Sequence, residues 1–82
     1  MHHPAYTALL SALVDARKEA RMHQATLAAK LGRPQSFVSK FEKGERRLDV
    51  VEFLSVCHAL AVDPGRILNS VSATLAADPL FL

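Results

Sequence analysis

Residues 35–44 read Gln35-Ser36-Phe37-Val38-Ser39-Lys40-Phe41-Glu42-Lys43-Gly44. Val38 and Phe41 lie three positions apart, so a helix places both side chains on one inward-facing stripe. The polar side chains then occupy the outer arc, and Gly44 tolerates the left-handed conformation that commonly closes a helix. Amides, hydroxyls and ammonium groups can hydrogen-bond to base edges and to phosphates. These ten residues are therefore predicted to form a short DNA recognition helix.

Basic residues are concentrated around this stretch. Nine of the ten lysines and arginines and three of the eight acids lie between residues 17 and 47, which gives that segment a net charge of +6. The rest of the chain carries −4, so the overall charge of +2 conceals an uneven distribution. A basic segment that surrounds a polar helix face favours nucleic acid as the partner.

The composition indicates one small domain. The chain has 82 residues and half of them are hydrophobic, which is enough for a packed core. No apolar run reaches the roughly 18 to 20 residues that cross a bilayer, and the first residues lack the pattern of a signal peptide. We therefore expect a cytoplasmic protein with no membrane partner. The single cysteine, Cys57, excludes an internal disulfide and is expected in the core.

Helical periodicity predicts two helices before the recognition helix. The first covers residues 6 to about 20, and the second covers residues 24–31 and ends at Gly32. Pro34 then interrupts the chain, because it disfavours helical geometry in the residue before it. The resulting link of about three or four residues is the length that a helix-turn-helix requires.

Two further helices are predicted after the recognition helix, which makes the fold class all-α with five helices. Asp49 and Glu52 form a predicted capping box at the start of the fourth helix, which runs to about residue 61. Its inward face is expected to include Val51 and Leu54. An acid followed by a proline predicts that the fifth helix covers residues 64 to about 76.

The expected organisation is a flexible N-terminus over residues 1–5, one domain over residues 6–77 and an apolar C-terminal tail over residues 78–82. The tail contains Leu80-Phe81-Leu82, which has no evident place in a five-helix monomer. It either folds back on its own domain or docks onto a protein partner, and the partner interpretation is preferred.

Two segments resemble the Cro/C1-type helix-turn-helix family, also called the XRE family. They are Gln24-Ala25-Thr26-Leu27-Ala28-Ala29-Lys30-Leu31-Gly32 and the stretch over residues 35–44. The similarity extends over about residues 9–68, through Leu54, Ala59-Leu60-Ala61-Val62 and Ile67-Leu68. It implies a compact, five-helix, lambda-repressor-like domain with the helix-turn-helix in its second and third helices. It also implies binding to double-stranded DNA, usually as a homodimer on a palindromic operator.

The resemblance assigns a partner to one inward-facing charge. Arg17 continues the apolar stripe of the first helix after Leu10 and Leu13, so its guanidinium is expected to need an acidic partner. The family has a recurrent ion pair between the first helix and the recognition helix. That pair maps here onto Arg17 and Glu42.

The docking geometry of the family also implies which side chains meet DNA, since the N-terminal part of the recognition helix enters the major groove. The expected base-reading residues are Gln35, Ser36, Ser39 and Lys40. The serines also suit a helix start for local reasons. The expected backbone or flanking contacts are Gln24, Phe37, Lys43, Arg46 and Arg47. Phe37 either covers thymine methyls or packs under the second helix, and packing is slightly preferred.

No enzymatic function is expected. The histidines have no cysteine or acid at a metal-ligand spacing, and no nucleophile, base and acid can be assigned from their order in the chain. Neither a cofactor nor a metal is therefore predicted. The preferred function is a sequence-specific transcriptional regulator of a bacterial or phage type. The alternatives are an antitoxin-type regulator that also binds a toxin, and a protein-interaction module without DNA binding.

Overall fold

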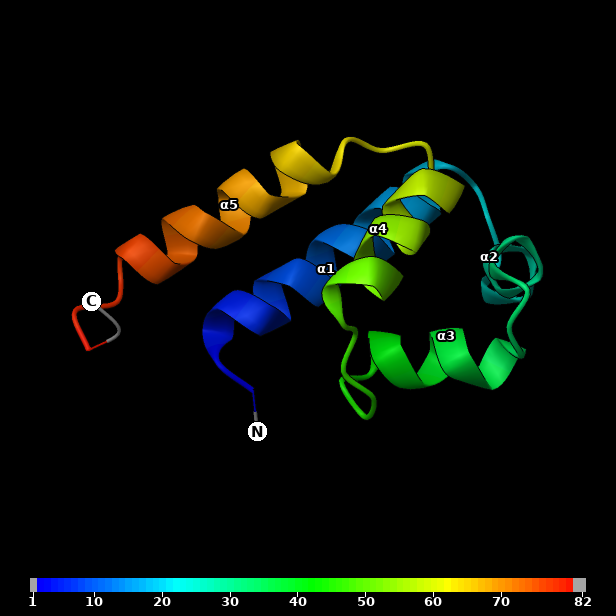
Figure 1. Cartoon of the computed structure of the whole chain (residues 1–82), viewed down its shortest axis with the longest axis horizontal. Helices are drawn as coiled ribbons and strands as arrows, with labels where there is room; N and C mark the ends of the chain where they lie inside the picture. Colours follow the sequence, from blue (N-terminus) through cyan, green and yellow to red (C-terminus); the bar gives the residue numbers. More distant parts are fainter. Residues whose placement is uncertain (1, 81–82) are drawn as a thin grey trace.

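The computed structural model describes residues 2–80, and this part of the chain forms five α-helices and no strands (Figure 1). They are α1 (Pro4–Glu19), α2 (Gln24–Leu31), α3 (Gln35–Glu42), α4 (Val50–Ala59) and α5 (Pro64–Ala76). Helix α2 packs against α3 and α4, while α1 packs against α3 and α5. The predicted all-α, five-helix fold class is confirmed.

Helix α1 begins at Pro4, two residues before the expected start. The Nδ1 atom of His3 accepts a hydrogen bond from the backbone N–H of Ala5 at 2.9 Å, and proline at the first helical position needs no such partner. Ala5 is buried, and the Nε2 atom of His2 contacts the backbone oxygen of Gly44. The expectation of a flexible N-terminus over residues 1–5 is therefore wrong for Pro4 and Ala5, which belong to the folded domain. Met1 lies outside the described residues.

The start of α4 has the capping box that the sequence predicted. The Asp49 carboxylate accepts from the backbone N–H of Glu52 at 2.7 Å, and the Glu52 carboxylate accepts from the backbone N–H of Asp49 at 3.0 Å. These two bonds satisfy donors that a helix start otherwise leaves free. The helix ends at Ala59, slightly before the expected end, because Ala61 adopts a positive φ of 56°.

The core lies between α1, α2, α3 and α4. Its fully buried side chains come from all four helices and are Leu13, Leu27, Val38, Phe41, Val56 and Cys57. Cys57 is thus a core residue, as its sequence context indicated, and burial raises the pKa of its thiol.

The inward face of α4 differs from the expected one. Val51 and Leu54 are 72% and 45% exposed, whereas Phe53 and Val56 are buried. The face with Val51 and Leu54 and the face with Phe53 and Val56 both carry apolar residues at helical spacing, so periodicity alone did not show which face is buried. Burying the arc that contains Phe53 removes a large aromatic surface from water, and this favours the observed orientation.

Helix α5 is the peripheral element of the fold. It lies beside α1 and extends away from the rest of the domain, and none of its side chains is fully buried (Figure 1). Leu80, beyond its end, is almost completely exposed, while Phe81 and Leu82 of the expected tail lie outside the described residues. Among the helices described, none combines the length and apolar character needed to cross a membrane.

Candidate nucleic-acid interface

The helix α3 is anchored on one side and open on the other. Pro34 precedes it in an extended conformation, and Gly32 closes α2 with a φ of 65°. Val38 and Phe41 are fully buried, so they fix α3 against the core. This arrangement confirms the inward stripe that the sequence predicted.

The four expected base-reading residues lie on the opposite arc of α3. Their positions fall on adjacent turns of one helix, so the side chains share one face. The structure leaves Gln35, Ser36 and Lys40 exposed and Ser39 half-buried. Helix α3 therefore presents amide, hydroxyl and ammonium groups together.

A largely buried ion pair ties α3 to α1. The Arg17 Nε donates to Glu42 Oε2 at 2.7 Å, and its Nη2 donates to Glu42 Oε1 at 3.1 Å. The remaining Nη1 of Arg17 donates to the backbone oxygen of Met22 at 2.8 Å. The two side chains are 12% and 7% exposed, so little water competes for these bonds. The expected pairing of Arg17 with Glu42 is present.

Gln24 belongs to the same network, which the sequence did not indicate. Its side-chain amide donates to Glu42 Oε1 at 2.8 Å, and the residue is half-buried. The structure thus places Gln24 where it helps to orient Glu42. Its contact with phosphate remains a prediction.

Phe37 is a core residue. Only 7% of it is exposed, and its ring centroid lies 5.6 Å from that of Phe41. The guanidinium carbons of Arg33 and Arg46 lie 4.1 Å and 4.8 Å from the Phe37 centroid, within the range of a cation–π contact. The slightly preferred expectation that Phe37 packs within the domain therefore agrees with its burial, while a flanking DNA contact by Phe37 remains a prediction.

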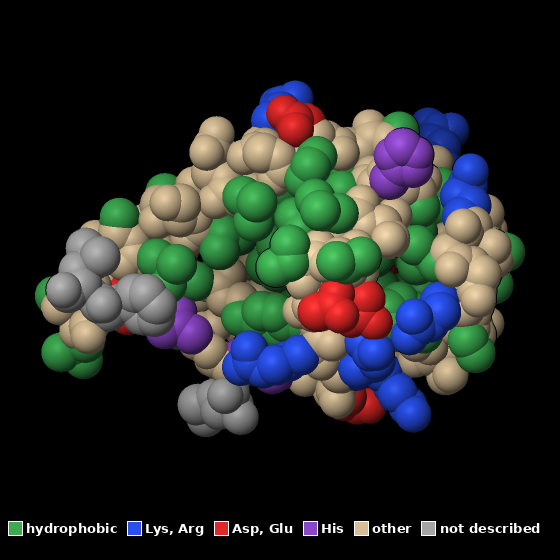
Figure 2. All heavy atoms as spheres, viewed as in Figure 1, with side chains coloured by type: hydrophobic (Ala, Val, Ile, Leu, Met, Phe, Trp, Pro, Cys, Tyr) green, Lys and Arg blue, Asp and Glu red, His purple; other side chains and the backbone are tan. Residues whose placement is uncertain are grey.

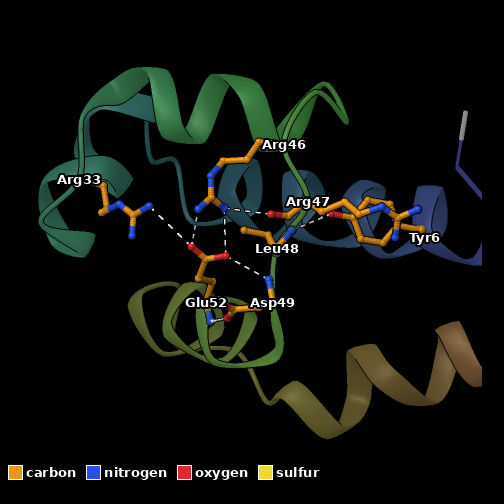
Figure 3. Close-up of polar contacts among 7 residues, drawn as sticks. All are labelled: Tyr6, Arg33, Arg46, Arg47, Leu48, Asp49 and Glu52. Carbon is orange, nitrogen blue, oxygen red and sulfur yellow. Dashed lines mark hydrogen bonds and ion pairs between the residues drawn. The ribbon is translucent and has the colours of Figure 1, made fainter.

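The same two arginines converge on Glu52 of α4 (Figure 3). Arg46 donates from Nη1 to Glu52 Oε1 at 2.9 Å and from Nη2 to Oε2 at 2.8 Å. Arg33 approaches Oε2 at 3.6 Å. The hydrogen bonds from Arg46, then the backbone N–H of Asp49, lower the pKa of Glu52 to about 2, so its carboxylate is charged at neutral pH.

Neither Arg33 nor Glu52 was among the expected site residues. The sequence assigned Glu52 to the capping box, and the structure shows that its carboxylate serves the cap and the arginines together. No local sequence pattern pairs Arg33 with Glu52, because Arg33 lies in the turn between α2 and α3 and Glu52 lies in α4. The pKa of Arg46 is raised, mainly by its hydrogen bonds to Glu52.

The loop between α3 and α4 is also held from α1. The Tyr6 hydroxyl accepts from the backbone N–H of Leu48 at 3.0 Å, and the guanidinium carbon of Arg47 lies 4.9 Å from the Tyr6 ring centroid. Arg47 and Lys43 remain exposed. The loop therefore presents cationic side chains from a fixed backbone.

These cations lie next to α3. Figure 2 shows lysine and arginine side chains grouped at the lower right, where Figure 1 places α3 and the loop that follows it. Apolar side chains instead gather at the centre of this view, near α4 and α5. Across residues 2–80, no three His, Cys, Asp or Glu side chains come together as a metal site would need. The short link from α2 and the anchored α3 define a helix-turn-helix domain.

Comparisons with known proteins agree with this geometry. A family model described as helix-turn-helix matches residues 13–67. A solved structure of an XRE-family like protein from Pseudomonas syringae pv. tomato str. DC3000 is similar to this chain, with 51% sequence identity and a TM-score of 0.82. The similarity covers 85% of each chain. A search of curated proteins found no match.

The chain belongs to the Cro/C1-type, or XRE, helix-turn-helix family. This is a family of DNA-binding regulators and not of enzymes.

Proposed function

We propose that this protein is a sequence-specific transcriptional regulator that binds palindromic double-stranded DNA as a homodimer in the cytoplasm. The observation that supports this proposal best is the outer arc of α3, where Gln35, Ser36, Ser39 and Lys40 share one face. The largely buried Arg17–Glu42 pair holds that face in a fixed orientation. In this proposal the four side chains read bases, while Lys43, Arg46 and Arg47 contact the flanking phosphates.

The homodimer is proposed to form through α5 and the tail over residues 78–82. Helix α5 buries none of its side chains fully, and Leu68 and Leu80 are exposed apolar residues on this part of the chain. A second copy that covered them would remove apolar surface from water. The same surface is the place where a toxin would bind in the antitoxin alternative.

The test is selection of bound sites from random duplex DNA, followed by affinity measurements at several salt concentrations. We expect the recovered sites to contain two inverted half-sites. Their centres should be separated by one helical turn of DNA, about 10 base pairs, or by a whole number of such turns. Affinity should fall steeply with salt, because bound phosphates release counterions. A single unrepeated half-site would contradict the homodimer. No affinity for any duplex at low salt would contradict the regulator and favour the protein-interaction module.

Two exposed residues of the interface should respond differently to truncation. Gln35→Ala is expected to relax selectivity at one base position, with a loss of about 1 to 3 kcal/mol in discrimination, because a glutamine amide can pair bidentately with adenine. Lys43→Ala should instead weaken binding to all sequences and reduce the salt slope by about one unit. Titration of each variant against selected and scrambled duplexes measures both effects. An equal loss on every duplex for Gln35→Ala would show that Gln35 does not read a base.

A further inference from the structure

The guanidinium of Arg46 is only partly engaged within the domain. Of its five N–H groups, two on Nη1 and one on Nη2 are used: Nη1 donates to Glu52 and to the backbone oxygen of Arg47, and Nη2 donates to Glu52. The Nε–H and the second Nη2–H have no hydrogen-bond partner in the part of the chain that the structure describes. These two groups point in the same direction along one edge of the guanidinium, which is the pattern that a phosphate accepts bidentately.

The surroundings of Arg46 hold that edge in place. Glu52 binds the Nη1–Nη2 edge (Figure 3). The guanidinium carbon of Arg46 also lies 4.8 Å from the centroid of the Phe37 ring. Glu52 is itself fixed by the capping box with Asp49. An arginine whose rotamer is already fixed loses less conformational entropy when it binds an anion.

The electrostatic balance still favours an anion. Arg33 and Arg46 share the Glu52 carboxylate, and Arg47 on the adjacent loop offsets the charge of Asp49, so these three arginines and two acids keep a net charge of +1 at neutral pH. Glu52 is only 17% exposed, whereas the Arg46 side chain is 38% exposed. A phosphate can therefore reach the partly exposed Arg46 side chain without displacing Glu52 from the Nη1–Nη2 edge.

We propose that Glu52 is a positioning residue that aims the Nε–Nη2 edge of Arg46 at a phosphate of the DNA backbone beside α3. This inference rests on the proposed function, since it assigns one contact of the same interface. It assigns Glu52 a supporting role for DNA binding, although a carboxylate close to DNA would ordinarily oppose binding. The opposite mechanism is that Glu52 masks Arg46 and has to release it.

A double-mutant cycle separates the two mechanisms. Duplex affinity and salt slope are measured for the unaltered protein, Glu52→Gln, Arg46→Ala and the double variant. In the Arg46→Ala background, Glu52→Gln should leave affinity unchanged or improve it slightly, because it removes a negative charge and releases Arg33 from its ion pair. In the protein that keeps Arg46, we expect Glu52→Gln to weaken duplex binding. Its effect on affinity there should be at least about fivefold less favourable than its effect in the Arg46→Ala variant. Glutamine retains the oxygen that caps Asp49, and urea unfolding checks that each variant folds.

Arg46→Lys provides a second test that does not depend on residue 52. Lysine keeps the positive charge but has no planar edges, so it cannot bind Glu52 and a phosphate bidentately at the same time. We expect it to weaken binding nearly as much as Arg46→Ala, with a salt slope close to that of the unaltered protein. Affinity equal to that of the unaltered protein would overturn the positioning role.

The results also separate this inference from the proposed function. Zero coupling energy between residues 46 and 52 would overturn the inference while duplex binding stands. So would a Glu52→Gln change that raises duplex affinity more when Arg46 is present than when it is absent. No binding of duplex DNA by the unaltered protein would overturn both.

Discussion

Glu42→Ala should destabilise the fold by about 3 to 5 kcal/mol, because it leaves the Arg17 guanidinium charged and largely buried without its carboxylate. The Nε and Nη2 donors of Arg17 and the amide of Gln24 would lose their acceptor in one step. Among the hydrogen bonds within residues 2–80, the bond from Arg17 to the backbone oxygen of Met22 would be the one that remains to Arg17. Urea unfolding at neutral pH, followed by circular dichroism, measures the change in unfolding free energy.

Glu45→Ala is the matched control for this experiment. Glu45 is an exposed acid three residues further along the chain, so its removal should change the unfolding free energy by no more than about 0.5 kcal/mol. Equal stability for Glu42→Ala and the unaltered protein would show that the Arg17–Glu42 pair does not hold α3 to α1.

Phe37→Ala should also cost about 3 to 5 kcal/mol of unfolding free energy, because it removes a buried ring and leaves a cavity beside Phe41. The variant also loses the surface against which Arg33 and Arg46 lie. We therefore expect a lower melting temperature and, where the variant still folds, weaker binding to all duplexes. Thermal unfolding and duplex titration on the same samples measure the two effects.

The control for Phe37→Ala is Ser36→Ala, its exposed neighbour on α3, which should change stability by no more than about 0.5 kcal/mol. A stable Phe37→Ala variant that lost selectivity at a thymine position would instead support the base-contact interpretation of Phe37. Phe37→Leu distinguishes the loss of core packing from the loss of the aromatic contact with the arginines. Leucine fills most of the core site but offers no aromatic face to Arg33 and Arg46.

Sequence reasoning succeeded where the signal is local. The starts of α3 and α5 agree with their predicted positions, because Pro34, and Asp63 followed by Pro64, act on the backbone within one helical turn. The capping box at Asp49 was predicted on the same basis. The family pattern additionally supplied the pairing of Arg17 with Glu42, which no local rule contains.

Where a residue had two acceptable environments, the sequence left the choice open or favoured the wrong one. The apolar residues of α4 cover more than one arc, and only contact with the other helices buried Phe53 and left Val51 exposed. Phe37 lies at the boundary between the inner and outer arcs of α3, and the two arginines that cover it come from outside the helix. Such choices depend on which surfaces meet, so they are properties of the packed domain.

The stretch over residues 35–44 shows the same division. Its own residues specify a helix with Val38 and Phe41 inward and four polar side chains outward, because helical geometry sorts them onto opposite arcs. The tertiary structure placed Glu42 against Arg17 and Gln24, and it gathered Arg33 and Arg46 around Phe37 and Glu52. Those contacts join side chains from separate elements, and their geometry exists only once the helices have packed against one another.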